Sequence, residues 1–235
     1  MKVETVFFDV GGVLEDRSAV DREIVPISAE VLAACGVGSV NEADVVAYRT
    51  RLTAALGDRP WENRYFYWRD LIEAVSGSRP SDDVVDRAYG IYLDAYSSRV
   101  QIHVDVKPAL QMLKSLPVEL ALISNATMAK TKRFLARVAL TKSFTAAVIS
   151  EEVGSSKPSP VIFSYALYRT GRAPGACMHV GDGLRNDYLA AESAGMVGVL
   201  LNRRPSESER NGEGSGARRR IHSLTELAGL IEEIS

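Results

Sequence analysis

The chain opens with the segment Val6-Phe7-Phe8-Asp9-Val10-Gly11-Gly12, in which a short apolar run leads directly to an aspartate and two glycines. Four further apolar runs have the length of a buried strand: residues 120–123, 146–149, 196–201 and, more weakly, 178–180. Between the runs lie segments with helical apolar spacing or high alanine content: 108–116, 128–138, 160–168 and 184–194. Strands that alternate with helices predict an α/β fold with a doubly wound, mostly parallel, Rossmann-like sheet.

Residues 15–99 interrupt this alternation. Their apolar periodicity is helical, over about 28–35, 41–56, 61–75 and 81–98, and no strand run is visible there. We therefore expect a helical domain over 15–99, inserted into an α/β core domain formed by 1–14 and 100–235. Residues 223–226, Ser-Leu-Thr-Glu, predict a capping box before the last helix, and the polar, glycine-rich residues 203–217 predict a loop.

The composition excludes several classes of protein. The 235 residues include 28 Lys and Arg against 30 Asp and Glu, a net charge of −2, so we expect no nucleic-acid partner. No apolar run approaches the roughly 20 residues of a membrane-spanning helix, and no signal peptide is visible, so we expect no membrane association. The chain has only two cysteines, which favours a cytoplasmic location. The sequence leaves open whether the protein forms a homodimer, because an amphipathic helix can also pack against a second copy of the chain.

Polar residues follow three of the predicted strands. Asp9 follows the first strand, Ser124 and Asn125 the second, and Asp182 the weak run, with Asp187 five residues later. Ligands of open parallel sheets bind beyond the carboxyl ends of the strands, so we expect these side chains at one sheet edge. Each aspartate alone could be a turn residue or a helix cap. Three carboxylates together need a cation, and oxygen ligands favour Mg²⁺.

Four motifs, in order, resemble those of the haloacid dehalogenase superfamily. They are residues 8–14 (FDVGGVL), 123–125 (ISN), 157–160 (KPSP) and 179–187 (HVGDGLRND). Their spacing resembles the subfamily whose helical cap is inserted after the first strand. The resemblance implies that the helical insertion is this cap, and that the sheet edge carries hydrolytic chemistry.

The resemblance implies a magnesium-dependent phosphohydrolase that acts on a small phosphorylated metabolite. Asp9 would attack phosphorus and form an aspartyl-phosphate, which splits hydrolysis into two easier steps. Lys157 would contact the phosphoryl group and the Asp9 carboxylate. Ser124 and Asn125 would bind phosphoryl oxygens.

The implied Mg²⁺ ligands are the Asp9 carboxylate, the backbone carbonyl of Gly11 and Asp182. Asp187 would be a further ligand, or a partner of one. The chain departs from the family pattern at Gly11, because most phosphatases of the family carry a second aspartate there as the general acid and base. Such proton transfer is worth roughly 10²–10⁴-fold in rate.

Three interpretations stay open beside the ordinary phosphatase. The enzyme could act on activated substrates such as acyl or anomeric phosphates, or take its acid from elsewhere, with Glu15 and Asp16 nearest in sequence. It could be a 2-haloacid dehalogenase, since those members also lack the second aspartate. It could be a binding or regulatory protein with weak turnover. Residues 15–99 contain no lysine, which excludes a phosphonatase-type Schiff base. Arg64 and Arg69 could contact an anionic substrate or form a solvated face.

Overall fold

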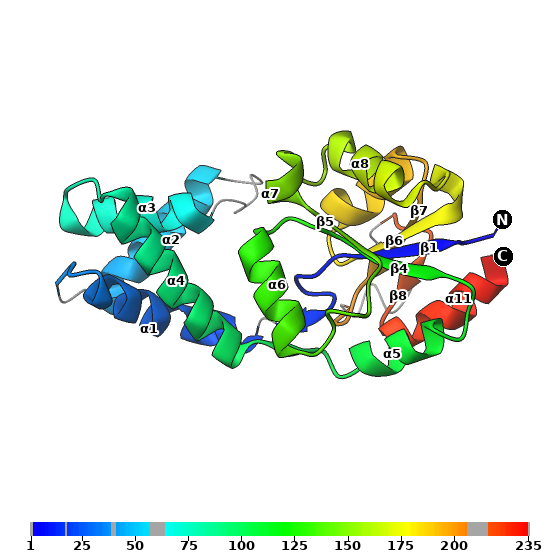
Figure 1. Cartoon of the computed structure of the whole chain (residues 1–235), viewed down its shortest axis with the longest axis horizontal. Helices are drawn as coiled ribbons and strands as arrows, with labels where there is room; N and C mark the ends of the chain where they lie inside the picture. The colour runs from blue at the N-terminus through cyan, green and yellow to red at the C-terminus, as the bar shows by residue number, and fades with distance from the viewer. Residues whose placement is uncertain (1, 17, 39–40, 57–63, 206–215, 235) are drawn as a thin grey trace. The chain divides into compact units, whose positions relative to one another are not determined.

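The computed structural model describes residues 2–16, 18–38, 41–56, 64–205 and 216–234. Its main sheet contains β1 (Thr5–Phe8), β4 (Glu119–Ser124), β5 (Ala146–Ile149), β6 (Cys177–Gly181), β7 (Val197–Leu201) and β8 (Arg220–Ile221). The strand order is β5-β4-β1-β6-β7-β8, and all of these neighbours pair in parallel (Figure 1). All five apolar runs of the sequence are therefore strands.

Helices cover both faces of this sheet. Helix α8 (Pro160–Thr170) lies on one side, and α5 (Val106–Leu113) and α11 (Leu227–Ile234) lie on the other (Figure 1). Shorter helical segments complete this unit: α7 (Ser150–Val153), η1 (Pro174–Ala176), η2 (Leu184–Leu189), α9 (Ala190–Ser193) and η3 (Leu224–Glu226). The architecture is the doubly wound α/β fold that the sequence predicts.

One small predicted feature is confirmed, and one small feature was not predicted. The capping box at Ser223 is present, with the Glu226 side chain accepting from the Ser223 N–H at 2.8 Å. A second sheet has two strands, β2 (Glu15–Asp16) and β3 (Gln101–Ile102). The expectation of no strand in 15–99 is therefore wrong at β2, because two residues are too few to show a period-two pattern. Most of the predicted loop 203–217 lies outside the described residues.

The chain divides into two compact units, one formed by 1–16, 102–125 and 138–235, the other by 17–101 and 126–137. The second unit holds α1 (Ser18–Ala34), α2 (Glu42–Leu56), α3 (Arg64–Ser76), α4 (Asp82–Arg99) and α6 (Met128–Arg137). The predicted core domain, 1–14 and 100–235, includes residues 126–137, which this division groups with the helices instead. The apolar face of a helix indicates that the helix is packed, but not which unit it packs on. Among the described residues, no helix is long and apolar enough to cross a membrane.

The helical unit has its own aromatic core. Trp68, Tyr92 and Tyr96 are all nearly fully buried, and the rings of Trp68 and Tyr92 lie 5.5 Å apart. Helix α6 joins this core through Lys130, whose ammonium lies 4.5 Å from the centre of the Tyr96 ring.

Helix α1 begins ten positions before the predicted start at residue 28, because Pro26 obscures the helical pattern there.

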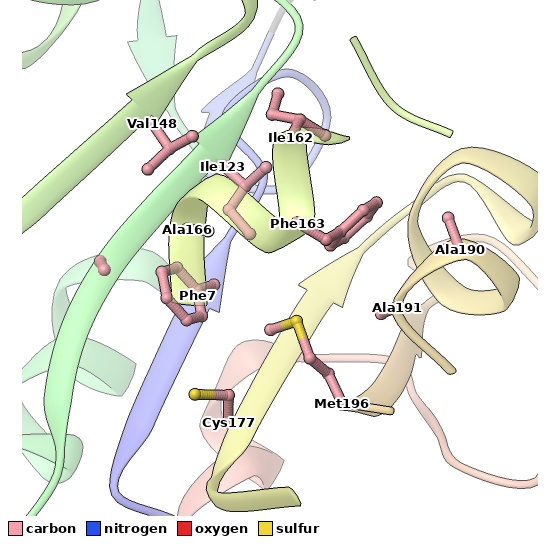
Figure 2. Packing of buried hydrophobic residues seen from close by; sticks show 11 residues of the cluster. Phe7, Ile123, Val148, Ile162, Phe163, Ala166, Cys177, Ala190, Ala191 and Met196 are labelled. Atoms are coloured by element: carbon pink, nitrogen blue, oxygen red, sulfur yellow. The ribbon is translucent and has the colours of Figure 1, made fainter. Parts of the chain in front are cut away.

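One part of the core of the α/β unit lies between the sheet and α8. Phe7 of β1, Ile123 of β4 and Val148 of β5 pack against Ile162 and Phe163 of α8, and all five side chains are fully buried (Figure 2). Burying an apolar side chain of this size stabilises the fold by about 1.5–3 kcal/mol. The packing therefore fixes the strands on which the polar residues of the sheet edge stand.

The pairing register of β1 with β4 and β6 places the carboxyl ends of these three strands side by side. Phe8 pairs with Leu122 of β4 and with Val180 of β6. The next residue along β1, Asp9, donates its N–H to the carbonyl of Val180 at 2.9 Å. The residues that follow these strands therefore leave the sheet at one edge.

Candidate active site

Asp9 and Lys157 form the buried centre of this edge. Asp9 is 9% exposed and Lys157 is 2% exposed. The Lys157 ammonium lies 2.8 Å from Oδ1 of Asp9 and 2.5 Å from Oδ1 of Asp187. Burial opposes the charge on Lys157, but the two carboxylates outweigh it and raise the pKa of the lysine above its usual value. The two carboxylates therefore favour the charged form of the lysine between them.

Three carboxylates meet at this point. Asp9, Asp182 and Asp187 each offer an oxygen, and these oxygens lie within 4.8 Å of one another. Desolvation, together with the charges of Asp9 and Asp187, raises the pKa of Asp182 to about 7. Desolvation also raises the pKa of Asp9, against the lowering effect of Lys157. One ammonium thus leaves negative charge uncompensated, and carboxylate oxygens are ligands that Mg²⁺ prefers, so these residues fit a Mg²⁺ ion.

Two glycines make the close approach of the carboxylates sterically feasible. A Cβ on Gly12 would lie 2.0 Å from Oδ2 of Asp182, and a Cβ on Gly181 would lie 2.1 Å from Cβ of Asp187. Gly12 also has φ +80°, a conformation that favours glycine. The glycines of the first and fourth motifs therefore make room for acidic side chains.

Asp187 is fully engaged by the protein. Its Oδ1 accepts from Lys157 and lies 2.9 Å from Nε2 of His179, and its Oδ2 accepts from the N–H of Gly183 at 3.0 Å. Burial opposes ionisation, but Lys157 and the His179 hydrogen bond hold the pKa of Asp187 well below its usual range. Asp187 therefore stays ionised and fixes the position of the lysine.

His179 contacts Asp187 in this candidate site, although the sequence motifs gave it no role. It is fully buried in β6, and burial lowers its pKa, so the ring is neutral. Because the Asp187 carboxylate is ionised and only accepts, the Nε2 of His179 carries the hydrogen. The ring also packs edge-on against Phe163, with 5.5 Å between centroids. A polar residue inside an apolar strand run, three positions before Asp182, was the available signal.

Asn125 uses its side chain to hold the segment that carries Lys157. Its Oδ1 accepts from the Lys157 N–H at 2.8 Å, and its Nδ2 donates to the Lys157 carbonyl at 2.9 Å. Both ends of the amide are thus occupied, which leaves the backbone N–H of Asn125 as the group it can offer to a phosphate. Ser124, the last residue of β4, is 3% exposed.

The remaining candidates lie on the first loop and in the helical unit. Gly11 forms an isolated bridge with Glu15 and offers only backbone groups, so the position has no proton donor in its side chain. Arg69 lies 3.6 Å from Asp70 and is 23% exposed. The side chain of Arg64 lies outside the described residues.

Residues 3–195 match the family model described as haloacid dehalogenase-like hydrolase. The chain therefore belongs to the haloacid dehalogenase-like hydrolase family and is an enzyme of the hydrolase class. This confirms the family that the four sequence motifs indicated.

The relatives carry more specific names. The chain is similar to a glyceraldehyde 3-phosphate phosphatase of Methanopyrus kandleri, 28% identical over 86% of this chain and 84% of that protein. It is also similar to a ribulose-1,5-bisphosphate 5-phosphatase of Halopiger xanaduensis, 31% identical over 73% of this chain and 72% of that protein. The solved structure of a 2-haloacid dehalogenase from Pseudomonas syringae aligns with a TM-score of 0.76 at 24% identity, over 99% of this chain and all of that one. This structural similarity shows the fold.

Proposed function

We propose that the protein is a magnesium-dependent phosphohydrolase that acts on a small phosphorylated metabolite through an aspartyl-phosphate at Asp9. The observation that carries the proposal is the group of three carboxylates at the carboxyl edge of the sheet, two of which contact one buried lysine. The two relatives described above are both named as phosphatases of small phosphorylated compounds. Residues 15–99 are proposed as the cap that contributes to substrate selection, and the two cysteines, both free, support the proposed cytoplasmic location.

The first step is attack of the Asp9 carboxylate on phosphorus. A bond forms between a carboxylate oxygen and phosphorus, and the bond to the leaving oxygen breaks. Lys157 orients Asp9 through its 2.8 Å contact and offers positive charge to the phosphoryl group. Ser124 and the backbone N–H of Asn125 would hold phosphoryl oxygens. Water then attacks the aspartyl-phosphate, which releases inorganic phosphate and restores Asp9.

The metal would be held by Asp9, Asp182 and the Gly11 carbonyl. When bound, Mg²⁺ supplies the positive charge that offsets the repulsion between a carboxylate and a phosphate. Asp187 has both oxygens engaged by Lys157, His179 and Gly183, so we assign it the role of a partner that orients Lys157 rather than a ligand.

The glycine at position 11 favours substrates that have good leaving groups. Without a carboxyl side chain at this position, the leaving oxygen receives no proton from residue 11. An acyl or anomeric phosphate needs that proton less than an alkyl phosphate, because its leaving group is a weaker base. We therefore expect activated phosphates to rank first.

Phosphate release from a panel of acyl, anomeric, aryl and alkyl phosphates tests the proposal. Each substrate is measured with Mg²⁺ and with chelator, for the wild type and for Asp9→Asn. Release that needs Mg²⁺ and disappears in Asp9→Asn is the expected result. A parallel assay of halide release from 2-haloacids tests the dehalogenase interpretation, because Gly11 also fits that chemistry. Chelator-insensitive halide release, without phosphate release, would contradict the phosphatase.

A further inference from the structure

Arg203 connects the loop after β1 to a distant part of the α/β unit. Its Nη2 donates to the carbonyl oxygen of Val13 at 2.8 Å, and its Nε donates to the carbonyl oxygen of Gly12 at 3.4 Å. Its Nη1 lies 2.6 Å from Oδ2 of Asp105. The side chain is 20% exposed, two residues beyond the end of β7. A planar guanidinium can serve three acceptors at once because its donors form a rigid fork.

Asp105 anchors the other end of this connection. Its Oδ2 also accepts from the N–H of Leu224 at 2.8 Å and from the Ser223 hydroxyl at 3.0 Å. The Asp105 side chain is only 10% exposed. Burial opposes its ionisation, but the hydrogen bonds from Arg203, Leu224 and Ser223 lower the pKa of Asp105 below its usual value. The anchor is therefore an ionised carboxylate tied to the start of η3.

The loop that Arg203 contacts is the one on which the proposed metal site depends. It carries Asp9 at its start and the Gly11 carbonyl beside Gly12. Gly12 has φ +80°, and Asp182 occupies the position that a Cβ of Gly12 would need. A rotation of the Gly11–Gly12 peptide would turn the Gly11 carbonyl away from its present direction. Inside the loop, the N–H of Gly12 donates to the carbonyl oxygen of Glu15 at 3.1 Å. Arg203 adds contacts from outside the loop to the next two carbonyl oxygens, those of Gly12 and Val13.

We propose that Arg203 is a positioning residue that holds the loop after Asp9 in the conformation in which the Gly11 carbonyl can bind Mg²⁺. This inference rests on the proposed function only for the metal. In this proposal Arg203 contacts neither the substrate nor the three carboxylates of the site, Asp9, Asp182 and Asp187. It acts through the carbonyls of Gly12 and Val13, with Asp105 as its anchor.

The test compares Arg203→Met with Arg172→Met. Arg172 is the matched control because it also joins two segments, with Nη1 2.8 Å from Glu4 and Nη2 3.1 Å from Glu119. Those glutamates lie at the amino ends of β1 and β4, far from the metal site along the same strands. Each variant loses an arginine that joins two segments of the chain, but only Arg203→Met loses contacts to the loop after β1.

Two measurements are made on the full chain without substrate. Calorimetric titration gives the dissociation constant of Mg²⁺, and hydrogen exchange reports the amides of Gly12, Leu14 and Glu15, whose hydrogen bonds close the loop. Arg203→Met is expected to weaken Mg²⁺ binding about tenfold or more, as is usual for partners of metal ligands, and to speed exchange of these amides. Arg203→Lys keeps the positive charge but not the planar, forked guanidinium, so its Mg²⁺ affinity is expected to be close to that of Arg203→Met.

The outcomes separate this inference from the proposed function. Equal Mg²⁺ dissociation constants in the Arg203 and Arg172 variants would overturn the positioning role. If even the wild type binds no Mg²⁺, the metal part of the proposed function fails, and the exchange measurement decides alone. Equal exchange of the loop amides in both variants would then overturn the inference.

Discussion

Replacing Lys157 by methionine removes the one ammonium that contacts Asp9 and Asp187 while nearly preserving side-chain volume. Three carboxylates whose oxygens lie within 4.8 Å would then have no lysine among them, and the formal charge of the group would change from −2 to −3. Breaking a buried ion pair by removing one partner costs about 3–5 kcal/mol. We expect the free energy of unfolding to fall by about this amount at pH 7 in the presence of chelator.

The same variant has a defined dependence on pH. In the wild type, Asp187 has a lowered pKa, so the stability it contributes is present at neutral pH and is lost as the pH falls through its folded pKa. Without Lys157, desolvation and mutual repulsion raise the carboxylate pKa values, so ionisation destabilises the folded state. Stability of Lys157→Met should therefore rise more than that of the wild type as the pH is lowered from 7 toward 5. In the wild type the raised pKa values of Asp9 and Asp182 produce some rise, but Asp187 adds nothing to it.

Urea unfolding at pH 5 and pH 7, with chelator or Mg²⁺, measures both effects. Lys132→Met, a substitution of an exposed lysine in α6, is the matched control and should change stability little. The double variant with Asp187→Asn should lose less than the sum of the single losses, because neighbouring changes are not additive. A loss below about 1 kcal/mol for Lys157→Met at pH 7, or a gain on acidification no larger than that of the wild type, would refute the electrostatic account.

Three further predictions concern turnover and metal binding. Asp9→Asn should abolish phosphate release and leave the unfolding transition intact; substantial residual turnover would exclude the covalent step. Gly11→Asp should speed hydrolysis of alkyl phosphates by about 10²–10⁴-fold and change activated phosphates less, since only the former need the proton; an equal effect on both would show that another group already supplies it. Because the pKa of Asp182 is about 7 in the metal-free site, Mg²⁺ affinity should fall as the pH drops from 8 to 6, and calorimetric titration showing a flat profile would contradict this.

The strands and the acidic edge were predictable from the sequence for one physical reason. A buried parallel strand is a short apolar run, and the residue after it is placed at the sheet edge whatever the rest of the chain does. Asp9 and Asp182 could thus be assigned from their positions alone. The glycines that admit these carboxylates came with the same motifs.

Contacts between distant segments were not predictable in this way. Arg203 meets Gly12 and Val13 across 191 and 190 residues, and no periodicity relates such positions. The contact of His179 with Asp187 was not predicted, because a buried polar residue in a strand usually forms hydrogen bonds that serve only the fold. Helix α6 shows the same limit at a larger scale, since its apolar face could be read but not the unit on which that face packs.

The side-chain amide of Asn125 behaves toward Lys157 as a neighbouring strand would, giving one donor and one acceptor to the same residue. Few side chains can imitate a peptide group in this manner: aspartate has no donor, serine is too short, and leucine offers neither function. A substitution at Asn125 would therefore have the same effect as a substitution at Lys157, because it would displace the lysine without changing it. Screens that score only charged residues of such an enzyme would overlook an amide on which the placement of its cation depends.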